Sequence, residues 1–210
     1  MLLSIDTSSG TTVAVVGEGV RVFRSEHDTR RHAEVVGDLI AECLAEAGVR
    51  STDIEGVAVG MGPGPFTGLR VGIAAAIAFS VGRGIPLYRV VSHDAIAFEH
   101  YRTGGTGPLL VVSDARRREV YWSTYSGVED GGIPCRVDGP ALCPPAELGQ
   151  RVPAWGDYPG EGELSAPVAA DALAELALRM REHRRDFCGP EPLYLRAADA
   201  KVPTGPKRVS

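Results

Sequence analysis

The first residues that could do chemistry follow the first apolar run of the chain. Asp6 closes the run, and Thr7, Ser8 and Gly10 lie in the short polar turn after it. Amides and hydroxyls that converge in such a turn can bind an anion, and a carboxylate at its start can hold a hydrated metal ion. An ordinary turn, in which Asp6 accepts hydrogen bonds from its own backbone, has the same pattern. Spacing alone favours the ordinary turn over a nucleotide or phosphate site.

A second candidate is the glycine-rich string Gly60–Gly72, which leads from an expected strand into an expected helix. This geometry offers free amides to a phosphate. The string lacks the lysine of the Walker pattern, and Pro65 stands where the dinucleotide pattern requires its last glycine. The alternative is a tight turn whose glycines let the helix lie close to its neighbours.

Metal-ligand spacing is absent from the sequence. No two of the five histidines are four residues apart, and the four cysteines form no C-x-x-C pair. We therefore expect no metal site and reduced thiols. His32 is expected at a helix start, and no acid or nucleophile can be assigned to it.

Charge and hydropathy narrow the class of protein. The 210-residue chain is 44% hydrophobic with a net charge of −5, which indicates a globular protein without a broad basic surface for a phosphate backbone. The arginines Arg116–Arg118 favour a solvated turn, with contact to RNA or an acidic partner as the alternative. The longest apolar run, Val71–Val81, is shorter than the ~20 residues of a spanning helix, and the N-terminus shows no signal peptide. We expect a cytoplasmic protein with no membrane contact.

Hydrophobic periodicity predicts the elements that position these residues. The expected strands span residues 2–6, 12–16, 20–23, 56–60, 87–91, 109–114, 119–125 and 192–196, and the expected helices 31–47, 67–82, 93–101 and 171–184. This order predicts an α/β protein with a ribonuclease-H-like mixed sheet flanked by helices. Because 109–125 repeats the strand, acidic turn and strand of 2–16, we interpret the chain as two half-folds, the second truncated. The predicted lobes are 1–104 and 105–198, with a mobile tail at 199–210.

The first two helices carry small and apolar residues around more of their circumference than one core can cover. The first helix has such residues at four-residue spacing, namely Ala33, Gly37, Ala41 and Ala45. The second has Gly68, Gly72, Ala76 and Ser80, beside Leu69, Ile73, Ile77 and Val81. The pattern favours a partner interface over burial beneath the chain's own second half.

The full pattern of motifs resembles one known family. The motifs are Ile5-Asp6-Thr7, Arg31-His32-Ala33-Glu34, the Gly60–Gly72 string, Asp114-Ala115-Arg116 with Glu119-Val120-Tyr121-Trp122, and Glu191–Arg196. In this order they resemble the bacterial tRNA threonylcarbamoyladenosine biosynthesis protein family TsaB (YeaZ), of the actin/Hsp70/sugar-kinase (ASKHA) superfamily. The sequence departs from the family at Pro65, where serine is usual.

The resemblance implies a non-catalytic subunit without a cofactor of its own. Such a subunit binds the related catalytic subunit TsaD and works with the small ATPase TsaE. The complex transfers a threonylcarbamoyl group to the adenosine next to the anticodon, in tRNAs that read codons beginning with A. We also expect that ATP or ADP can bind at the complex interface. Because the net charge is negative, tRNA should bind mainly through the complex, and the helix surfaces predict a homodimer when the subunit is alone. The alternatives are a small ASKHA-type ATPase or kinase and a glycoprotease-like hydrolase. Further motif residues have no assigned role: Gly62, Gly64, Thr67, Arg70, Asp114, Glu119 and Tyr121.

Overall fold

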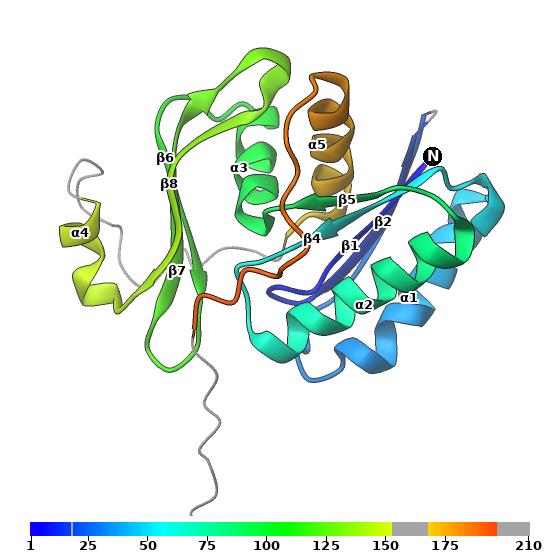
Figure 1. Cartoon of the computed structure of the whole chain (residues 1–210), viewed down its shortest axis with the longest axis horizontal. Helices are drawn as coiled ribbons and strands as arrows, with labels where there is room; N and C mark the ends of the chain where they lie inside the picture. The colour runs from blue at the N-terminus through cyan, green and yellow to red at the C-terminus, as the bar shows by residue number, and fades with distance from the viewer. Residues whose placement is uncertain (18, 153–167, 197–210) are drawn as a thin grey trace, which may run out of the picture.

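The computed structural model describes residues 1–17, 19–152 and 168–196, which form two sheets and five helices (Figure 1). The first sheet contains β1 (Leu2–Asp6), β2 (Thr11–Gly17), β3 (Val20–Glu26), β4 (Gly56–Gly60) and β5 (Leu87–Val90). The second contains β6 (Leu109–Asp114), β7 (Val120–Val128) and β8 (Pro134–Cys143). The helices are α1 (His32–Ala47), α2 (Phe66–Arg83), α3 (Ser92–Arg102), α4 (Leu148–Arg151) and α5 (Ala170–Glu182).

The first sheet is mixed, with the strand order β3-β2-β1-β4-β5. Short turns join β1, β2 and β3, so these strands pair antiparallel. β4 and β5 follow the crossover helices α1 and α2 and pair parallel. The predicted ribonuclease-H-like arrangement is confirmed.

Helices cover both faces of the first sheet (Figure 1). Because neighbouring side chains of a strand point to opposite faces, Leu3 and Ile5 pack beneath α1 and α2, whereas Leu2 packs in the core that contains α3 and α5. All five residues of β1 are buried. The end of β1, which carries Asp6, is thereby fixed in the interior.

The second sheet repeats the opening of the first as an antiparallel meander, in the order β6-β7-β8. α3 lies between the two sheets, where its Ala97 packs against Val111 and Tyr125. On the other face of the second sheet, Leu148 of α4 packs against Trp122. Sequence analysis did not predict β8, because its glycine and two prolines are typical of loops.

The C-terminal segments return to the first half of the chain. α5 packs on β1 and β2 of the first sheet. The strand predicted at residues 192–196 is wrong: the segment joins no sheet, although the Leu193 amide donates to the Met61 carbonyl at 2.9 Å. The predicted lobe boundary at residue 104 falls between α3 and β6, and the predicted tail 199–210 lies outside the described residues.

By length and composition alone, α2 is long and apolar enough to cross a membrane. The sequence estimate of Val71–Val81 missed this because it stopped short of Arg70. One face of α2 nevertheless packs on the sheet, where Leu69 and Ala76 are fully buried. A helix with one face in the core of a globular protein passes the same test, so this finding is weak evidence for a membrane span.

Candidate functional site

The carboxylate of Asp6 is enclosed and already hydrogen bonded. Its Oδ1 accepts from the Ser8 amide at 2.8 Å and the Ser8 hydroxyl at 2.6 Å, and its Oδ2 accepts from the Ser92 hydroxyl at 2.6 Å. Burial raises the pKa of Asp6, and the hydrogen bonds from Ser8 and Ser92 act in the opposite direction. The carboxylate thus joins the hairpin to the start of α3.

The glycine string closes over the same hairpin. A Cβ atom on Gly64 would lie 2.9 Å from the Ser8 Cα, and one on Gly72 would lie 2.3 Å from the Thr7 Oγ1. The Thr7 hydroxyl donates to the Gly68 carbonyl at 2.8 Å and accepts from the Gly72 amide at 3.1 Å. α2 can approach the hairpin this closely only because these positions lack side chains.

These contacts fit the ordinary turn that spacing favoured, rather than the weaker candidate, a nucleotide or phosphate site at Asp6, Thr7, Ser8 and Gly10. All four residues are buried, and the Thr7 and Ser8 hydroxyls are bonded to the chain itself, whereas the Ser9 hydroxyl between them and Gly10 has no hydrogen-bond partner among the described residues. The ordinary-turn alternative describes the hairpin better. The glycine string likewise serves close packing, and Gly62, with a φ of +94°, occupies the left-handed region that favours glycine.

The second hairpin explains part of the motif whose role was unassigned. Asp114 Oδ1 accepts the Arg116 amide at 2.7 Å, and the Glu119 carboxylate pairs with the Arg196 guanidinium. The Tyr121 hydroxyl donates to the Gly64 carbonyl at 3.4 Å, which links this hairpin to the glycine string. These residues therefore hold together the two hairpins and the C-terminal segment.

The turn of the second hairpin has an unusual backbone. Arg116, Arg117 and Arg118 have φ angles of +61°, +56° and +62°. For residues other than glycine the left-handed conformation costs roughly 1–2 kcal/mol each. All three residues are exposed, so no core packing explains the conformation.

Both buried histidines are engaged internally. His93 lies between two hydroxyls, with Nδ1 2.9 Å from Ser123 Oγ and Nε2 2.8 Å from Ser113 Oγ. Burial lowers its pKa to about 3, and the nearby Arg136 contributes in the same direction. His32 Nδ1 lies 2.7 Å from Thr11 Oγ1, and burial lowers the pKa of His32 as well. Neither ring is placed to act on an external substrate.

The residues predicted for the partner interface are exposed on α1, whereas on α2 only Ile77 and Val81 among them are exposed. Ala33, Gly37, Ala41 and Ala45 are exposed along α1. On α2, the predictions are wrong for the residues that the chain covers with its own sheet and hairpin, namely Gly68, Leu69, Gly72, Ile73, Ala76 and Ser80. α2 also has an apolar outer face, but sequence analysis placed most of the predicted partner contacts on the inner face.

The outer face of α2 is apolar and exposed. Val81 is 75%, Phe66 49% and Ile77 41% exposed. Ala74, Ala78 and Thr67 are exposed on the same helix, and the Arg70 guanidinium lies 4.3 Å from the centre of the Phe66 ring. We call Phe66, Ala74, Ile77, Ala78 and Val81 the outer α2 face. Sequence analysis missed Phe66, Ala74 and Ala78, although they recur with Arg70 at i, i+4 spacing, beside the i, i+4 pair Ile77 and Val81, and this pattern could have revealed the face.

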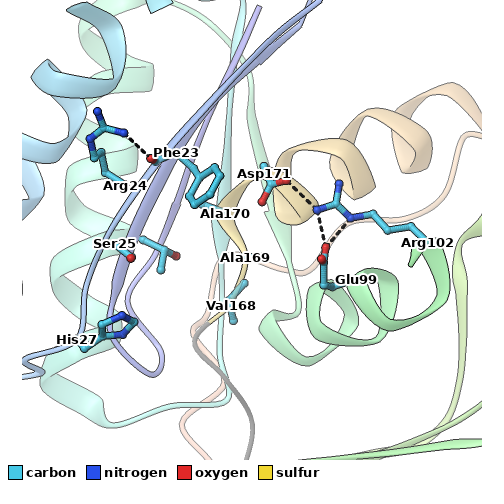
Figure 2. A pocket seen from close by; sticks show the side chains of 11 residues that line it. Phe23, Arg24, Ser25, His27, Glu99, Arg102, Val168, Ala169, Ala170 and Asp171 are labelled. Carbon is cyan, nitrogen blue, oxygen red and sulfur yellow. Dashed lines mark hydrogen bonds and ion pairs between the residues drawn. The ribbon is translucent and has the colours of Figure 1, made fainter. Parts of the chain in front are cut away.

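A cavity of about 350 Å³ lies between β3, α3 and the start of α5 (Figure 2). Its wall includes the Phe23 ring and the buried Thr12, whose hydroxyl has no hydrogen-bond partner among the residues that the structure describes. Arg102 donates to Asp171 at 2.7 Å and to Glu99 at 2.5 Å. Although burial acts to raise the pKa of Asp171, its hydrogen bonds with arginines hold that pKa below its usual value. This ion-pair cluster fastens α5 to α3.

Within residues 1–17, 19–152 and 168–196, no three histidine, cysteine or acidic side chains are grouped so that they could hold a metal ion. The four cysteines, all within these ranges, are free thiols.

Comparison with known proteins places these features in a family. The family model TsaD, described as tRNA N6-adenosine threonylcarbamoyltransferase, matches residues 23–151. An uncharacterized protein of Mycobacterium tuberculosis is 38% identical over 95% of this chain and 93% of its own length. The tRNA threonylcarbamoyladenosine biosynthesis protein TsaB of Escherichia coli is 29% identical over 93% of this chain and 94% of its own length.

The solved structures agree with this placement. A crystal structure described as an uncharacterized protein with similarity to peptidase YeaZ from Pseudomonas aeruginosa has a TM-score of 0.78 and 27% identity, and covers 93% of this chain and 99% of its own. YeaZ from Pseudomonas aeruginosa has a TM-score of 0.74 and 26% identity, and covers 87% of this chain and 92% of its own. The chain therefore belongs to the family that the TsaD model describes, within its TsaB (YeaZ) branch.

Proposed function

We propose that this chain acts in the biosynthesis of threonylcarbamoyladenosine on tRNA, as a non-catalytic subunit that binds a catalytic relative of the TsaD kind. The similarity to Escherichia coli TsaB extends over nearly the whole of both chains, which supports a role in the same pathway. The TsaD model matches the shared fold, which supports pairing between two related chains. A tRNA substrate makes the cytoplasm the expected compartment.

The observation that carries the proposal is the outer α2 face. Its large side chains, Phe66, Ile77 and Val81, are exposed on a helix whose inner face is buried in the chain's own core. Exposed apolar surface of this kind marks a protein contact. The small residues of α1 let the backbone of a partner helix approach closely. When the catalytic relative is absent, the same surface can pair with a second copy about a two-fold axis.

The internal bonding of the reactive groups supports a non-catalytic role. The Asp6 carboxylate is buried and accepts hydrogen bonds from Ser8 and Ser92, and His93 is held between two serines. The catalytic chemistry, the ATPase TsaE, any nucleotide at the complex interface and most of the tRNA contacts are then supplied by the assembled complex. Apart from the word peptidase in the description of one solved relative, no observation favours the ATPase, kinase or hydrolase alternatives.

The test is a charge placed on the outer α2 face. Val81→Arg and Ile77→Arg change exposed residues and leave the core intact, whereas Ala76→Arg would disrupt the core because Ala76 is fully buried. The matched control is Val137→Arg on β8, since Val137 is 64% exposed on the second sheet. Sedimentation of each variant alone and with the catalytic relative measures both kinds of association, and thermal melting confirms folding.

We expect Val81→Arg to weaken self-association and partner binding at least ~10-fold, because a buried unpaired charge costs several kcal/mol. We expect Val137→Arg to behave like the wild type. If a folded Val81→Arg, Ile77→Arg double variant binds the catalytic relative with wild-type affinity, the partner docks elsewhere and the proposed interface is wrong.

A further inference from the structure

The proposed function does not use the left-handed turn at Arg116–Arg118. Arginine gains nothing locally from positive φ angles, in contrast to glycine or asparagine, yet three arginines adopt them in succession. Residues held in sparsely populated backbone conformations persist only where their surroundings fix them, and they cluster at functional sites. The turn is therefore a candidate binding element.

Contacts of Arg116 and Arg196 hold the turn in place. The Arg116 amide donates to Asp114 Oδ1 at 2.7 Å, and the Arg116 side chain donates to Thr29 Oγ1 at 3.1 Å. The Arg196 guanidinium donates to the Arg116 carbonyl at 3.3 Å and pairs with Glu119. The guanidinium groups are thus presented by a fixed backbone, which lowers the conformational entropy lost on binding.

Further arginines lie near the turn, in a chain whose net charge is −5. Thr29 is followed by Arg30 and Arg31, which are exposed at the start of α1. α2 begins nearby, since Tyr194, two residues before Arg196, stacks on Phe66 with ring centres 4.7 Å apart. The first turn of α2 contains no acidic residue, so the positive end of its dipole is not neutralised there. The carboxylates of this region pair with its arginines: Asp28 with Arg30, Glu26 and Glu34 with Arg31, Asp114 with Arg116, and Glu119 with Arg196.

We propose that the Arg116–Arg118 turn binds the phosphate backbone of RNA. The planar guanidinium fork matches phosphate oxygens, and three consecutive forks on a fixed turn suit the repeated phosphates of a strand. RNA is favoured over an acidic protein because the apolar outer α2 face already provides a separate surface for a protein partner. This inference rests on the proposed function and names this chain's own contact with the tRNA.

The experiment measures the affinity of the full-length chain for an unmodified tRNA transcript by fluorescence anisotropy over a series of salt concentrations. The test variant replaces Arg116, Arg117 and Arg118 with glutamine. The control replaces Arg181, Arg184 and Arg185 with glutamine, which removes the same charge at the far end of α5 (Figure 1). We expect weak wild-type binding at low salt, at least a ~10-fold loss in the test variant, and a slope of log K against log salt that falls by about 2. The control should lose less than ~3-fold.

A second variant separates binding from structure. Arg118→Gly relieves the backbone strain, so we expect a higher melting temperature together with weaker RNA binding. If the turn were only structural, the melting temperature would change and RNA binding would not. Equal losses in the test and control variants would show a general charge effect, and a loss of partner binding with unchanged RNA binding would assign the turn to a protein contact. Either result would overturn the inference.

The reconstituted modification reaction distinguishes this inference from the proposed function. If both hold, the glutamine variant needs more tRNA to reach the wild-type rate but still supports the reaction at saturating tRNA. If only the RNA contact is wrong, the variant behaves like the wild type and the chain is still required. A reaction that does not require the chain would reject the proposed function instead.

Discussion

The buried His93 makes a quantitative prediction about stability and pH. Its two ring nitrogens are hydrogen bonded to Ser113 and Ser123, and burial lowers its pKa to about 3, against about 6.5 for an unfolded histidine. Between these values the unfolded state binds more protons than the folded state. The stabilisation is therefore fully present above the unfolded pKa and is lost as the pH falls towards the folded pKa. Between pH 7 and pH 5 the loss amounts to about 2 kcal/mol in the free energy of unfolding.

The assay compares urea unfolding of the wild type and His93→Gln at pH 7 and pH 5. Burial raises the pKa of Asp6 and of Asp94. A carboxyl with a raised pKa makes the folded protein more stable as the pH falls, which opposes the effect of His93. Only the difference between the two proteins therefore isolates His93. We expect the wild type to lose about 2 kcal/mol more than His93→Gln over this interval.

The control is His183→Gln, because His183 is exposed at the end of α5. It should keep the pH dependence of the wild type. If His93→Gln also keeps the pH dependence of the wild type, the assignment of a buried neutral imidazole between the two serines is refuted, whatever the stability of this variant at pH 7.

Three further predictions concern the hairpin and the ion-pair cluster. Gly64→Ala should lower the free energy of unfolding by ~1–3 kcal/mol, because the added Cβ would lie 2.9 Å from the Ser8 Cα. The control Gly37→Ala should not destabilise the protein, because no atom lies within 4 Å of its added Cβ. Equal melting temperatures of the two variants would contradict the close packing at Gly64. Arg102→Met should cost roughly 2 kcal/mol, since it removes the guanidinium that pairs with Glu99 and that shares Asp171 and Glu175 with Arg21. Chemical denaturation of the same change at an exposed arginine of α5 is the reference, and an equal cost there would contradict a special role for the cluster. The purified chain should neither hydrolyse ATP nor cleave peptide, so an ATP turnover that disappears in Asp6→Ala would show that the closed hairpin opens to a substrate.

Periodicity predicted most elements because the strands and helices of this chain obey their local patterns. Leu2–Asp6 and Gly56–Gly60 were predicted to the residue, since both are short apolar runs bounded by turns. β8 was missed because its glycine and prolines are accommodated by pairing with β7 and by irregular register, which no local pattern reveals. The segment 192–196 is apolar like a strand, but it lies across the glycine string and pairs with no strand.

The site was harder to predict because it depends on long-range packing. The Asp6 turn contains the residue types of an anion site, and only the approach of the glycine string and Ser92 shows that it is closed. The nearly uniform apolarity of α2 gave the sequence little to separate its inner from its outer face. Adjacent arginines do not by themselves predict a left-handed turn, so the strain at Arg116–Arg118 became visible only in the folded backbone.

The most direct test of the account is the rate of threonylcarbamoyl transfer to tRNA by the reconstituted subunits, measured with this chain, without it, and with Val81→Arg in its place. The account predicts full activity with the wild-type chain, none above background without it, and a strong loss with Val81→Arg that excess variant protein partly restores. Transfer at the same rate without the chain, or by this chain in the absence of the catalytic relative, would contradict the account.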